Sequence, residues 1–567
     1  MLTSPATLPN PSPLNKIYNI FVMEEILLNK VGKKVILLGN EAIVRGALEE
    51  RIDFVSTYPG TPASEIGDVF FKLSQDKNYR GYFEFSTNEK VALEAGIGAS
   101  FSGLKTLVAM KNFGLNVCLD SLLPFVYAGA KGPTVIVVAD DPSCHSSAQS
   151  EENSRFIAYT AHIPVLEPSD PQECKDFLRL GFRISERYKI PVIVRTTTRV
   201  AHQKMPVTLG QMPKLESRKG RFVKDVKSFV TLPPRVLEMK KELLEKIKKI
   251  KEFSEKQSVN LLIGKPSRQK LGIIASGISY LYVMEALKEL NLSLPVLKLG
   301  FFYPLPEEKI KNFIKKFGKI LVVEELEPYL EKEVERLAKN INPKLQIFGK
   351  NLVPEIGELK PEYVIQAIAK ITGKFYNLQP ETHDLVIKRF PQLCPGCPYW
   401  LVISAIKKAV DVKDVIFGGE IGCYMLFGNP PVDLQDYLSC MGSSVGIAHG
   451  IKKSTGQKII AFVGDSSFFH AGIPALINTV FNKSNPLIII LNNQTTAMTG
   501  HQPHPAAQSE PNGINIEAVV RACGVKHVKT INQINQEEFV NTVKDFLEKP
   551  EVSVIIATNP CVFVAKK

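Results

Sequence analysis

The stretch "IIAFVGDSSFFHAGIPALINTVFNKSNPLIIILNNQTTAMTG", residues 459–500, contains two apolar runs that each end in polar residues. The first run ends at Gly464-Asp465-Ser466, and the second ends at Asn492-Asn493. Short, continuous apolar runs separated by a helix-like segment are typical of buried strands in a parallel sheet. Ligands of such sheets bind at the carboxyl ends of the strands. The stretch therefore predicts a doubly wound α/β domain that gathers polar groups at one edge of its sheet.

The polar ends of these two runs would supply oxygen ligands for a hard divalent cation. Asp465 offers a carboxylate, Asn493 offers an amide oxygen 28 positions later, and Thr495 offers a backbone carbonyl. Gly464 would let the backbone approach phosphate groups, and Ser466 could donate a hydrogen bond. This pattern resembles the thiamine diphosphate signature, a Gly-Asp-Gly followed by Asn-Asn, with Ser466 in its third position. Two ordinary strand-end turns remain the alternative, because short motifs recur by chance.

The same alternation of apolar runs and helix-like stretches continues through most of the 567 residues, which are too many for one hydrophobic core. It predicts an α/β protein with three doubly wound parallel-sheet domains. The runs "KVILLG" (34–39) and "PVLKLGF" (295–301) are each expected to form one strand of such a sheet. We expect a flexible leader at residues 1–32 and three domains at 33–205, 263–380 and 381–567. Residues 206–262 are expected to form a basic linker with one helix.

Charge and hydropathy narrow the class of protein. Lys and Arg number 70 against 57 Asp and Glu, giving a net charge of +13 that could serve an anionic cofactor or an acidic protein partner. Much of the excess lies on stretches such as "EMKKELLEKIKKIKEF" (238–253), where a solvated helix face is favoured over a nucleic-acid groove. The first apolar run, residues 17–28, is broken by two glutamates and is too short for a membrane span or signal peptide. We expect a cytoplasmic protein that binds neither nucleic acid nor membrane.

Nine cysteines, an odd number, do not indicate a disulfide framework in a reducing compartment. Two of them, Cys394 and Cys397, form a Cys-x-x-Cys pair in "LCPGCPYW" (393–400). That spacing is consistent with two of the ligands of a metal site, with a redox dithiol at a helix N-terminus, or with two core residues. The residues alone leave these three interpretations open.

A first-turn glutamate, Glu89, opens a helix-like stretch rich in alanine and glycine, "NEKVALEAGIGA" (88–99). Small residues permit close packing where a cofactor bridges two domains, although a glutamate here could also serve only as a helix-dipole partner. The order of the motifs resembles the alpha subunit of indolepyruvate:ferredoxin oxidoreductase, a thiamine diphosphate-dependent 2-oxoacid:ferredoxin oxidoreductase, from about residue 38 onward. The motifs that carry the resemblance are "TYPGTP", "NEKVALEAGIGA", "GLNV", "DDPSCHSSAQSEENSRF", "LKLGFFYPLP", "CPGCP", "EIGCY", "SCMGSS", "GDSSFFHAGIPALIN" and "NNQTTAMTGHQPHP".

The resemblance implies a thiamine diphosphate-binding fold: a pyrimidine-side domain at 33–205, a transketolase C-terminal-like domain at 263–380 and a pyrophosphate-side domain at 381–567. It implies that Glu89 activates the cofactor and that Thr61, in "TYPGTP", faces cofactor and substrate. It also implies that Asp465, Asn493 and Thr495 are the magnesium ligands. The motif around Asp465, which includes Gly464 and Ser466, is implied to bind the diphosphate.

The resemblance also assigns four cysteines to a [4Fe-4S] cluster, which requires four thiolates. These are Cys394, Cys397, Cys423 and Cys561; zinc or a dithiol remain the alternatives. The other five cysteines are expected to be buried small hydrophobes: Cys118, Cys144, Cys174, Cys440 and Cys523. Relatives in this family carry a C-terminal ferredoxin-like domain, and we expect this chain to lack it.

The function implied is oxidative decarboxylation of an aryl 2-oxo acid, with coenzyme A as acyl acceptor and ferredoxin as electron acceptor. Implied partners are a smaller beta subunit, ferredoxin and a second alpha chain. His470, His501 and His504 lie near the cofactor motif and could move protons, although a histidine near a turn is more often structural. A non-redox thiamine diphosphate-dependent 2-oxoacid decarboxylase and a non-catalytic electron-relay scaffold are the competing hypotheses.

Overall fold

The computed structural model describes residues 23–77, 79–213, 219–264, 271–376, 390–507 and 512–565. They divide into two compact units, one within residues 13–381 and one within residues 382–567. We call these the N-terminal unit and the C-terminal unit and describe each by itself. Within the described ranges, no helix combines the length and hydrophobicity needed to cross a lipid bilayer.

The N-terminal unit contains a seven-stranded sheet in the order β12-β6-β7-β5-β4-β2-β3. All its neighbouring strands are parallel except β12, which runs antiparallel to β6 at one edge. Its strands are β2 (Phe54–Thr57), β3 (Tyr82–Phe85), β4 (Thr106–Lys111), β5 (Thr134–Asp140), β6 (Val165–Leu166), β7 (Val192–Thr197) and β12 (Phe301–Tyr303). Its helices are α2 (Gly39–Glu49), α3 (Ser64–Ser74), α4 (Glu89–Phe101), α5 (Asn112–Ala128), α6 (Arg155–Ala161), α7 (Pro171–Tyr188) and α8 (Thr198–His202). The central strands β4, β5 and β7 are almost entirely buried, which explains their continuous apolar sequences.

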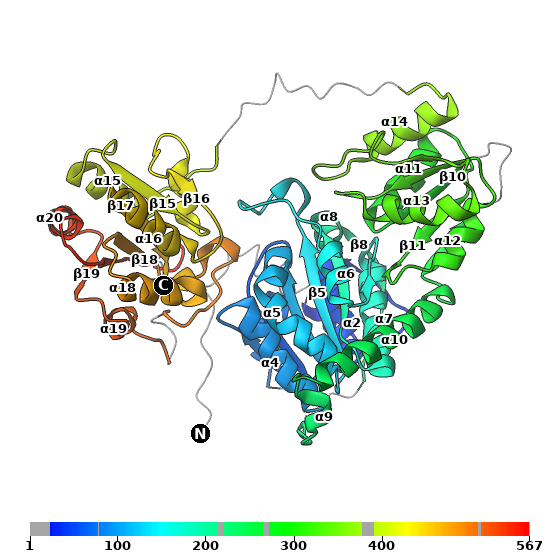
Figure 1. Ribbon diagram of the computed structural model, residues 1–567, viewed down its shortest axis with the longest axis horizontal. Helices are drawn as coiled ribbons and strands as arrows, with labels where there is room; N and C mark the ends of the chain where they lie inside the picture. The colour runs from blue at the N-terminus through cyan, green and yellow to red at the C-terminus, as the bar shows by residue number, and fades with distance from the viewer. Residues whose placement is uncertain are drawn as a thin grey trace. The chain divides into compact units, whose positions relative to one another are not determined.

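A second sheet of the same unit has five strands in the order β14-β13-β10-β11-β9, parallel except for the edge strand β9. Its strands are β9 (Asn260–Ile263), β10 (Leu271–Ser276), β11 (Val296–Leu299), β13 (Lys319–Val323) and β14 (Gln346–Phe348). Its helices are α11 (Ile278–Glu289), α12 (Glu307–Ile314), α13 (Tyr329–Ile341) and α14 (Pro361–Thr372). Figure 1 shows the seven-stranded sheet and its helices mainly in blue to cyan, and the five-stranded sheet and its helices in green.

Two strand predictions in this unit were wrong in detail. The run at 34–39 forms β1 (Lys34–Leu38), which pairs antiparallel with β8 (Lys204–Thr208) in a separate two-stranded sheet. Only alternate side chains of β1 are buried, as expected for a ribbon with one wet face rather than a central parallel strand.

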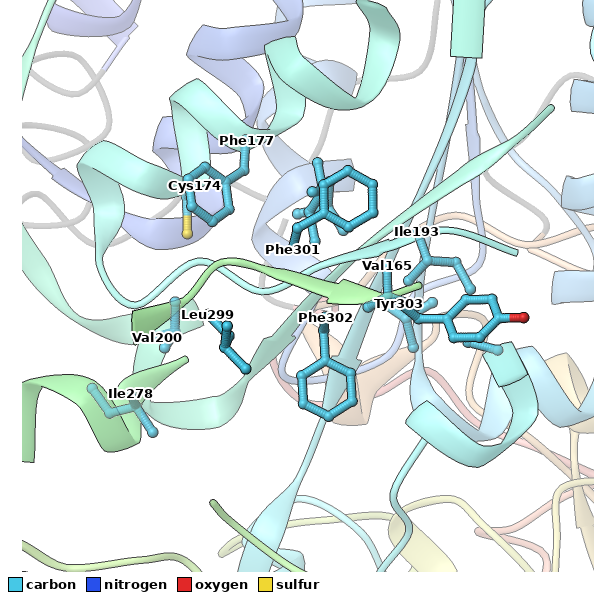
Figure 2. Close-up of a cluster of buried hydrophobic side chains, with 14 of the residues drawn as sticks. Val165, Cys174, Phe177, Ile193, Val200, Ile278, Leu299, Phe301, Phe302 and Tyr303 are labelled. Carbon is cyan, nitrogen blue, oxygen red and sulfur yellow. The ribbon is translucent and has the colours of Figure 1, made fainter. Parts of the chain in front are cut away.

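The run at 295–301 is not one strand, because Gly300 divides it between two sheets. Residues before the glycine form β11 of the five-stranded sheet, and residues after it form β12 of the seven-stranded sheet. A Cβ at Gly300 would lie 2.7 Å from the Phe177 ring of α7, so only glycine fits at this crossing. Figure 2 shows Phe301 and Phe302 projecting to opposite sides of the strand, with Phe301 on the same side as Phe177.

The segment expected as a basic linker carries a short helix α9 (Val226–Phe229) and the long helix α10 (Arg235–Glu255). α10 packs against α5 and α12 through a buried stripe that includes Met239, Leu243 and Ile250. Of the expected leader, residues from Met23 onward are described, and there Ile26 is fully buried and its carbonyl accepts a 2.7 Å hydrogen bond from Arg45.

The C-terminal unit is a six-stranded parallel sheet in the order β16-β15-β17-β18-β20-β19. Its strands are β15 (Val415–Gly419), β16 (Tyr437–Leu438), β17 (Lys458–Gly464), β18 (Leu487–Asn492), β19 (His527–Asn532) and β20 (Ser553–Thr558). Its helices are α15 (Tyr399–Ala409), α16 (Ser443–Thr455), α17 (Asp465–Ser467), a π-helical turn (Phe468–Gly472), α18 (Ile473–Phe481), α19 (Ile516–Ala522) and α20 (Gln536–Leu547). The α/β fold class with doubly wound parallel sheets is thus confirmed.

Candidate active site

The two polar strand ends of the C-terminal unit lie together, because β17 and β18 are neighbours with Gly464 opposite Leu491. Asp465 follows β17 and is buried, and each of its carboxylate oxygens accepts a backbone hydrogen bond. Oδ1 accepts from Ser466 N at 2.8 Å, and Oδ2 accepts from Gln494 N at 2.8 Å. The carboxylate therefore ties the turn after β17 to the turn after β18.

The turn after β18 is compact and buried. The Asn493 side-chain oxygen accepts a 3.2 Å hydrogen bond from Thr495 N, and both residues are more than nine-tenths buried. Gln494 between them has a φ of +65°, the left-handed conformation that reverses the chain. The preceding Asn492 has a buried side-chain oxygen with no hydrogen-bond partner among the described residues. Carboxylate, amide and carbonyl oxygens thus gather at one edge of the sheet.

A buried glutamate that sequence reasoning missed lies beside the end of β17. Glu420 accepts hydrogen bonds from the Tyr424 hydroxyl and from Gly442 N, and Gly464 N donates to the Tyr424 hydroxyl at 2.8 Å. Burial raises the pKa of Glu420 to about 7, against the effect of these hydrogen bonds. Its position immediately after the apolar strand β15 was the available signal, since acidic residues at parallel strand ends often serve ligand sites.

The three histidines near the cofactor motif have different surroundings. His504 Nε2 lies 3.3 Å from Asp465 Oδ2, so this ring faces the carboxylate directly. His470 is buried in the π-helical turn. His501 donates its backbone N–H to Thr496 O, and its ring centroid lies 5.9 Å from that of Phe563. His504 is thus placed to exchange a proton or hydrogen bond with the predicted magnesium ligand.

The four cysteines of the predicted cluster share one neighbourhood of the C-terminal unit. Burial raises the pKa of Cys397 to about 11, and negative charge on Cys561 and Cys394 adds to the effect. Burial likewise raises the pKa of Cys423 to about 12, with contributions from the same three thiols. Cys561 N donates to Asn493 O at 3.1 Å, which places this cysteine beside the turn after β18.

All four of these residues are free cysteines. Across the described ranges, no three cysteine, histidine, aspartate or glutamate side chains converge closely enough to hold a single metal ion. Of the remaining five cysteines, Cys118 and Cys174 are fully buried as expected. The expectation was wrong for Cys440, which is exposed in the loop after β16, and Cys144 and Cys523 are only half-buried.

In the N-terminal unit, Glu89 is the first residue of α4, and the side chain of Asn88 caps the helix by accepting a 2.8 Å hydrogen bond from Val91 N. The Glu89 side chain is buried and lies against Gly114 of α5, where an added Cβ would be 2.4 Å from Glu89 Cγ. The glycine therefore makes room for the glutamate between α4 and α5.

Thr61 lies in the loop between β2 and α3, and its hydroxyl is 3.4 Å from the Ser64 hydroxyl. The same loop is anchored by Asn40, whose amide donates to Pro62 O at 2.7 Å. Because β2 and β4 are parallel neighbours, Thr61 and the start of α5 lie at the same carboxyl edge of the seven-stranded sheet. Thr61 and Glu89 are thus both found at the edge where α/β folds bind ligands.

Two family descriptions match this chain. Residues 420–557 match the thiamine pyrophosphate enzyme, C-terminal TPP binding domain, and residues 45–248 match the pyruvate flavodoxin/ferredoxin oxidoreductase, thiamine diP-binding domain. Indolepyruvate oxidoreductase subunit IorA of Methanothermobacter marburgensis is 43% identical over 552 residues, which cover 95% of this chain and 88% of the relative. The chain belongs to the IorA family.

Two further IorA proteins support this membership. The one from Archaeoglobus fulgidus is 40% identical over 560 residues and the one from Pyrococcus horikoshii is 41% identical over 571 residues, each covering 95% of this chain and 88% or 87% of the relative. Among solved structures, a 2-oxoglutarate:ferredoxin oxidoreductase from Magnetococcus marinus aligns with a TM-score of 0.48 and 17% identity, over 60% of this chain and 65% of that chain.

As an IorA family member, the protein is a thiamine diphosphate-dependent 2-oxoacid ferredoxin oxidoreductase alpha subunit. The two matched thiamine diphosphate domains contain the two sets of residues predicted from the sequence. Glu89 and Thr61 lie in the match at 45–248, and Asp465 and Asn493 lie in the match at 420–557. Cys423 also lies in the second match, whereas Cys394, Cys397 and Cys561 lie outside both.

Proposed function

We propose that this protein oxidatively decarboxylates an aryl 2-oxo acid, indolepyruvate or a related arylpyruvate. In this proposal coenzyme A receives the acyl group, CO2 is released, and two electrons pass singly through a [4Fe-4S] cluster to ferredoxin. The observation that carries it is the position of Cys561, whose N donates to Asn493 O at the turn that would hold the cofactor diphosphate, together with the effect of three other cysteines on the pKa of Cys423. The IorA relatives are named indolepyruvate oxidoreductases, which supports the substrate class.

The residues of the C-terminal unit fit magnesium and a diphosphate. Asp465, Asn493 and Thr495 would supply carboxylate, amide and backbone carbonyl oxygens, the donors that a hard divalent cation prefers. Gly464 would let the backbone at the end of β17 approach a phosphate, and the Tyr424 ring lies 3.0 Å from the place that a Cβ would take there. Ser466 would donate its hydroxyl; in the protein alone it lies 3.4 Å from the Thr496 hydroxyl.

The four cysteines fit a cluster better than they fit a single ion. Each thiolate of a [4Fe-4S] cluster binds a different iron atom, so the four sulfurs need to share a neighbourhood without converging on one point. Burial and neighbouring thiols raise the pKa of Cys397, Cys423 and Cys561, and an iron-sulfur cluster would offset that cost by binding the sulfurs as thiolates. Cys394, Cys397, Cys423 and Cys561 would hold it.

The mechanism assigns roles to residues of both units. Bound thiamine diphosphate supplies a carbon nucleophile and the electron sink for decarboxylation. Glu89 would hold a hydrogen bond and proton at the aminopyrimidine ring, and its buried position would keep that proton from exchanging freely with water. Thr61 would orient the substrate by a hydroxyl hydrogen bond. His504, facing Asp465, would move a proton near the diphosphate.

The proposed partners are a smaller beta subunit, ferredoxin and a second alpha chain that helps to complete the active site. A protein with net charge +13 would attract an acidic ferredoxin. Because this attraction acts between solvent-exposed charges, the rate of ferredoxin reduction would fall as ionic strength rises.

The test is anaerobic purification with the beta subunit, followed by analysis of iron, sulfide and thiamine and by visible spectra before and after indolepyruvate and coenzyme A. We expect about four irons per alpha chain from this cluster, and bleaching when substrate is added. Cys423→Ser should remove this iron, whereas Cys440→Ser, at an exposed cysteine outside the cluster, should leave it unchanged. Thiamine without iron, together with CO2 release in the absence of an electron acceptor, would instead establish a non-redox decarboxylase.

A further inference from the structure

The strand end that carries the start of α5 presents an ammonium group whose hydrogen bonds go only to neutral oxygens, with Asp141 and Glu89 as charged neighbours. Lys111 is the last residue of β4, the strand between β2 and β5 in the seven-stranded sheet. Its Nζ donates to the Ser147 hydroxyl at 2.7 Å and to Ser146 O at 3.1 Å, and both acceptors are neutral. Among the described residues, no carboxylate forms an ion pair with Lys111.

The Lys111 side chain is held in place along its length. Its aliphatic stem packs on Gly60, where an added Cβ would lie 3.1 Å from Lys111 Cγ. Its ammonium lies 4.9 Å from the ring centroid of Phe113. Gly60 directly precedes Thr61, so the lysine stem lies against the loop that carries this predicted substrate-facing residue. A half-buried lysine fixed in this way presents a charge at a defined position.

The next residue, Asn112, is an independent sign of a missing ligand. Its side chain is 99% buried, and neither its amide nitrogen nor its amide oxygen has a hydrogen-bond partner among the described residues. A buried amide that makes no hydrogen bond is costly and rare in folded proteins. Asn112 is also the first residue of the 17-residue helix α5, which has no side-chain cap and no acidic residue in its first turn. The helix start therefore offers unpaired donors together with the lysine charge.

The chemistry of the neighbours identifies the ligand class. Two residues further along α5, Gly114 contacts the Glu89 side chain. Glu89 also acts electrostatically on Lys111, so an anion held at Lys111 and Asn112 would lie near the residue that would hold the aminopyrimidine ring of the cofactor. The substrate of the proposed reaction always carries one anionic group at a fixed distance from its reacting carbon, namely the carboxylate of the 2-oxo acid.

We propose that the Lys111 ammonium and the Asn112 amide form the subsite that binds the carboxylate of the 2-oxo acid. This inference rests on the proposed function and adds to it the residues that recognise the substrate. Lys111 supplies the charge and Asn112 donates a hydrogen bond from its amide nitrogen. Thr61 follows the glycine on which the lysine stem packs, and Glu89 lies against Gly114 of the same helix α5. Burial lowers the pKa of Lys111, although the negative charges of Asp141 and Glu89 act in the opposite direction, so the ammonium is partly withdrawn from water.

The test measures binding without turnover in the complete alpha–beta holoenzyme. Indole-3-propionate carries the carboxylate but no keto group, and indole-3-propionamide is its neutral counterpart. Calorimetry should show that the wild type binds the carboxylate more tightly than the amide, and that Lys111→Met loses about 100-fold in carboxylate affinity but little in amide affinity. Asn112→Asp, which adds a negative charge at nearly constant size, should weaken binding of the carboxylate alone.

Matched controls separate this result from a structural effect. Lys105→Met removes another lysine, next to the opposite end of β4 and paired with Glu50, and should leave the discrimination unchanged. Lys111→Arg should retain most of the carboxylate affinity. Should Lys111→Met fail to fold, Lys111→Gln, which can still donate to Ser147, takes its place in the same assay.

Three outcomes would overturn the inference. Equal loss of affinity for carboxylate and amide would make Lys111 a structural residue. If Lys111→Met and Asn112→Asp both still prefer the carboxylate ligand over the amide as the wild type does, the carboxylate binds elsewhere. A rise in the KM for coenzyme A with an unchanged KM for indolepyruvate would assign the lysine to the phosphates of coenzyme A. Failure of the proposed function is distinct, because the wild-type holoenzyme would then lack iron and release CO2 without an electron acceptor, or would not act on indolepyruvate.

Discussion

In the C-terminal unit both oxygens of the Asp465 carboxylate accept backbone hydrogen bonds, whereas in the N-terminal unit both polar atoms of the Asn112 amide lack partners among the described residues. Asp465 is held by two adjacent turns, so its position is set before any ligand binds. Such preorganisation reduces the cost of ordering groups on binding. Asn112 has no such support, which is the expected state of a group whose partner is a substrate that comes and goes.

The most damaging substitution should be Glu89→Gln, which tests whether the N-terminal unit supplies catalysis rather than binding. We expect kcat to fall about 10³-fold, because the amide cannot exchange the proton required at the aminopyrimidine ring. The bound thiamine diphosphate content should not change. Steady-state rates and proton exchange at the thiazolium carbon, followed by NMR, measure the effect.

Glu94→Gln is the control, since Glu94 lies on the same helix, is exposed and pairs with Lys90. Normal proton exchange in Glu89→Gln would show that Glu89 serves only as a helix-dipole partner.

Each unit also contains one buried glutamate whose pKa is raised to about 7, Glu325 in the N-terminal unit and Glu420 in the C-terminal unit. Burial is the main cause in both. The folded protein keeps a proton that the unfolded chain loses above about pH 4.5, so stability falls as pH rises from 4.5 to about 7 and stays lower above it.

Glu325→Gln removes this titration. Between about pH 4.5 and pH 8 its free energy of unfolding should therefore rise by about 3 kcal/mol relative to that of the wild type. Chemical denaturation at several pH values measures the free energy of unfolding. Parallel pH profiles for wild type and Glu325→Gln would show that Glu325 stays ionised in the folded protein.

The C-terminal unit should control cofactor affinity. Asp465→Ala removes the only carboxylate among the proposed magnesium ligands and the tie between the two turns, so the affinity for magnesium and thiamine diphosphate should fall about 100-fold. Titration of the cofactor into the apo-holoenzyme measures it. Asp545→Ala on α20, where the carboxylate is exposed, is the control. Unchanged affinity in Asp465→Ala would reduce the motif to two ordinary strand-end turns.

The smallest effect should come from one methyl group at Gly114. Gly114→Ala would push the Glu89 side chain aside, and kcat should fall about 10-fold even though alanine favours a helix over glycine by up to about 1 kcal/mol. Gly98→Ala in α4, where nothing lies within 4 Å of the added group, should gain that stability without losing activity. A fully active Gly114→Ala would show that the position of Glu89 is not critical.

The sequence predicted what depends on short stretches of chain. The two apolar runs within residues 459–500 form the central strands β17 and β18, and the Asp465 and Asn493 turns follow these strands directly. Such features are visible because a buried parallel strand needs a continuous apolar run and its ligand groups come immediately afterwards. The pairing of β17 with β18 then followed from their adjacency in the chain.

Features that depend on contacts between distant residues were not predictable. Nothing in "KVILLG" reveals that it pairs with residues 204–208, and only the alternate burial of its side chains marks it as a one-sided ribbon. In the sequence, Lys111 and Asn112 simply follow an apolar run and nothing marks them as a site. Their importance appears only when the structure shows which groups lack partners. A strand that ends in a basic residue before a helix without first-turn acids was the signal available for this site.

At Gly300 the chain passes directly from β11 of the five-stranded sheet to β12 of the seven-stranded sheet, so one segment of backbone forms hydrogen bonds in both sheets. A gene fragment that stopped before residue 296 would leave the two-residue strand β6 as an open edge, and open edges promote aggregation. A fragment that began after residue 263 would carry Phe301 and Phe302 without the surface that buries them. A fragment that contains only one of the two sheets should therefore not fold on its own, and the two sheets should unfold together.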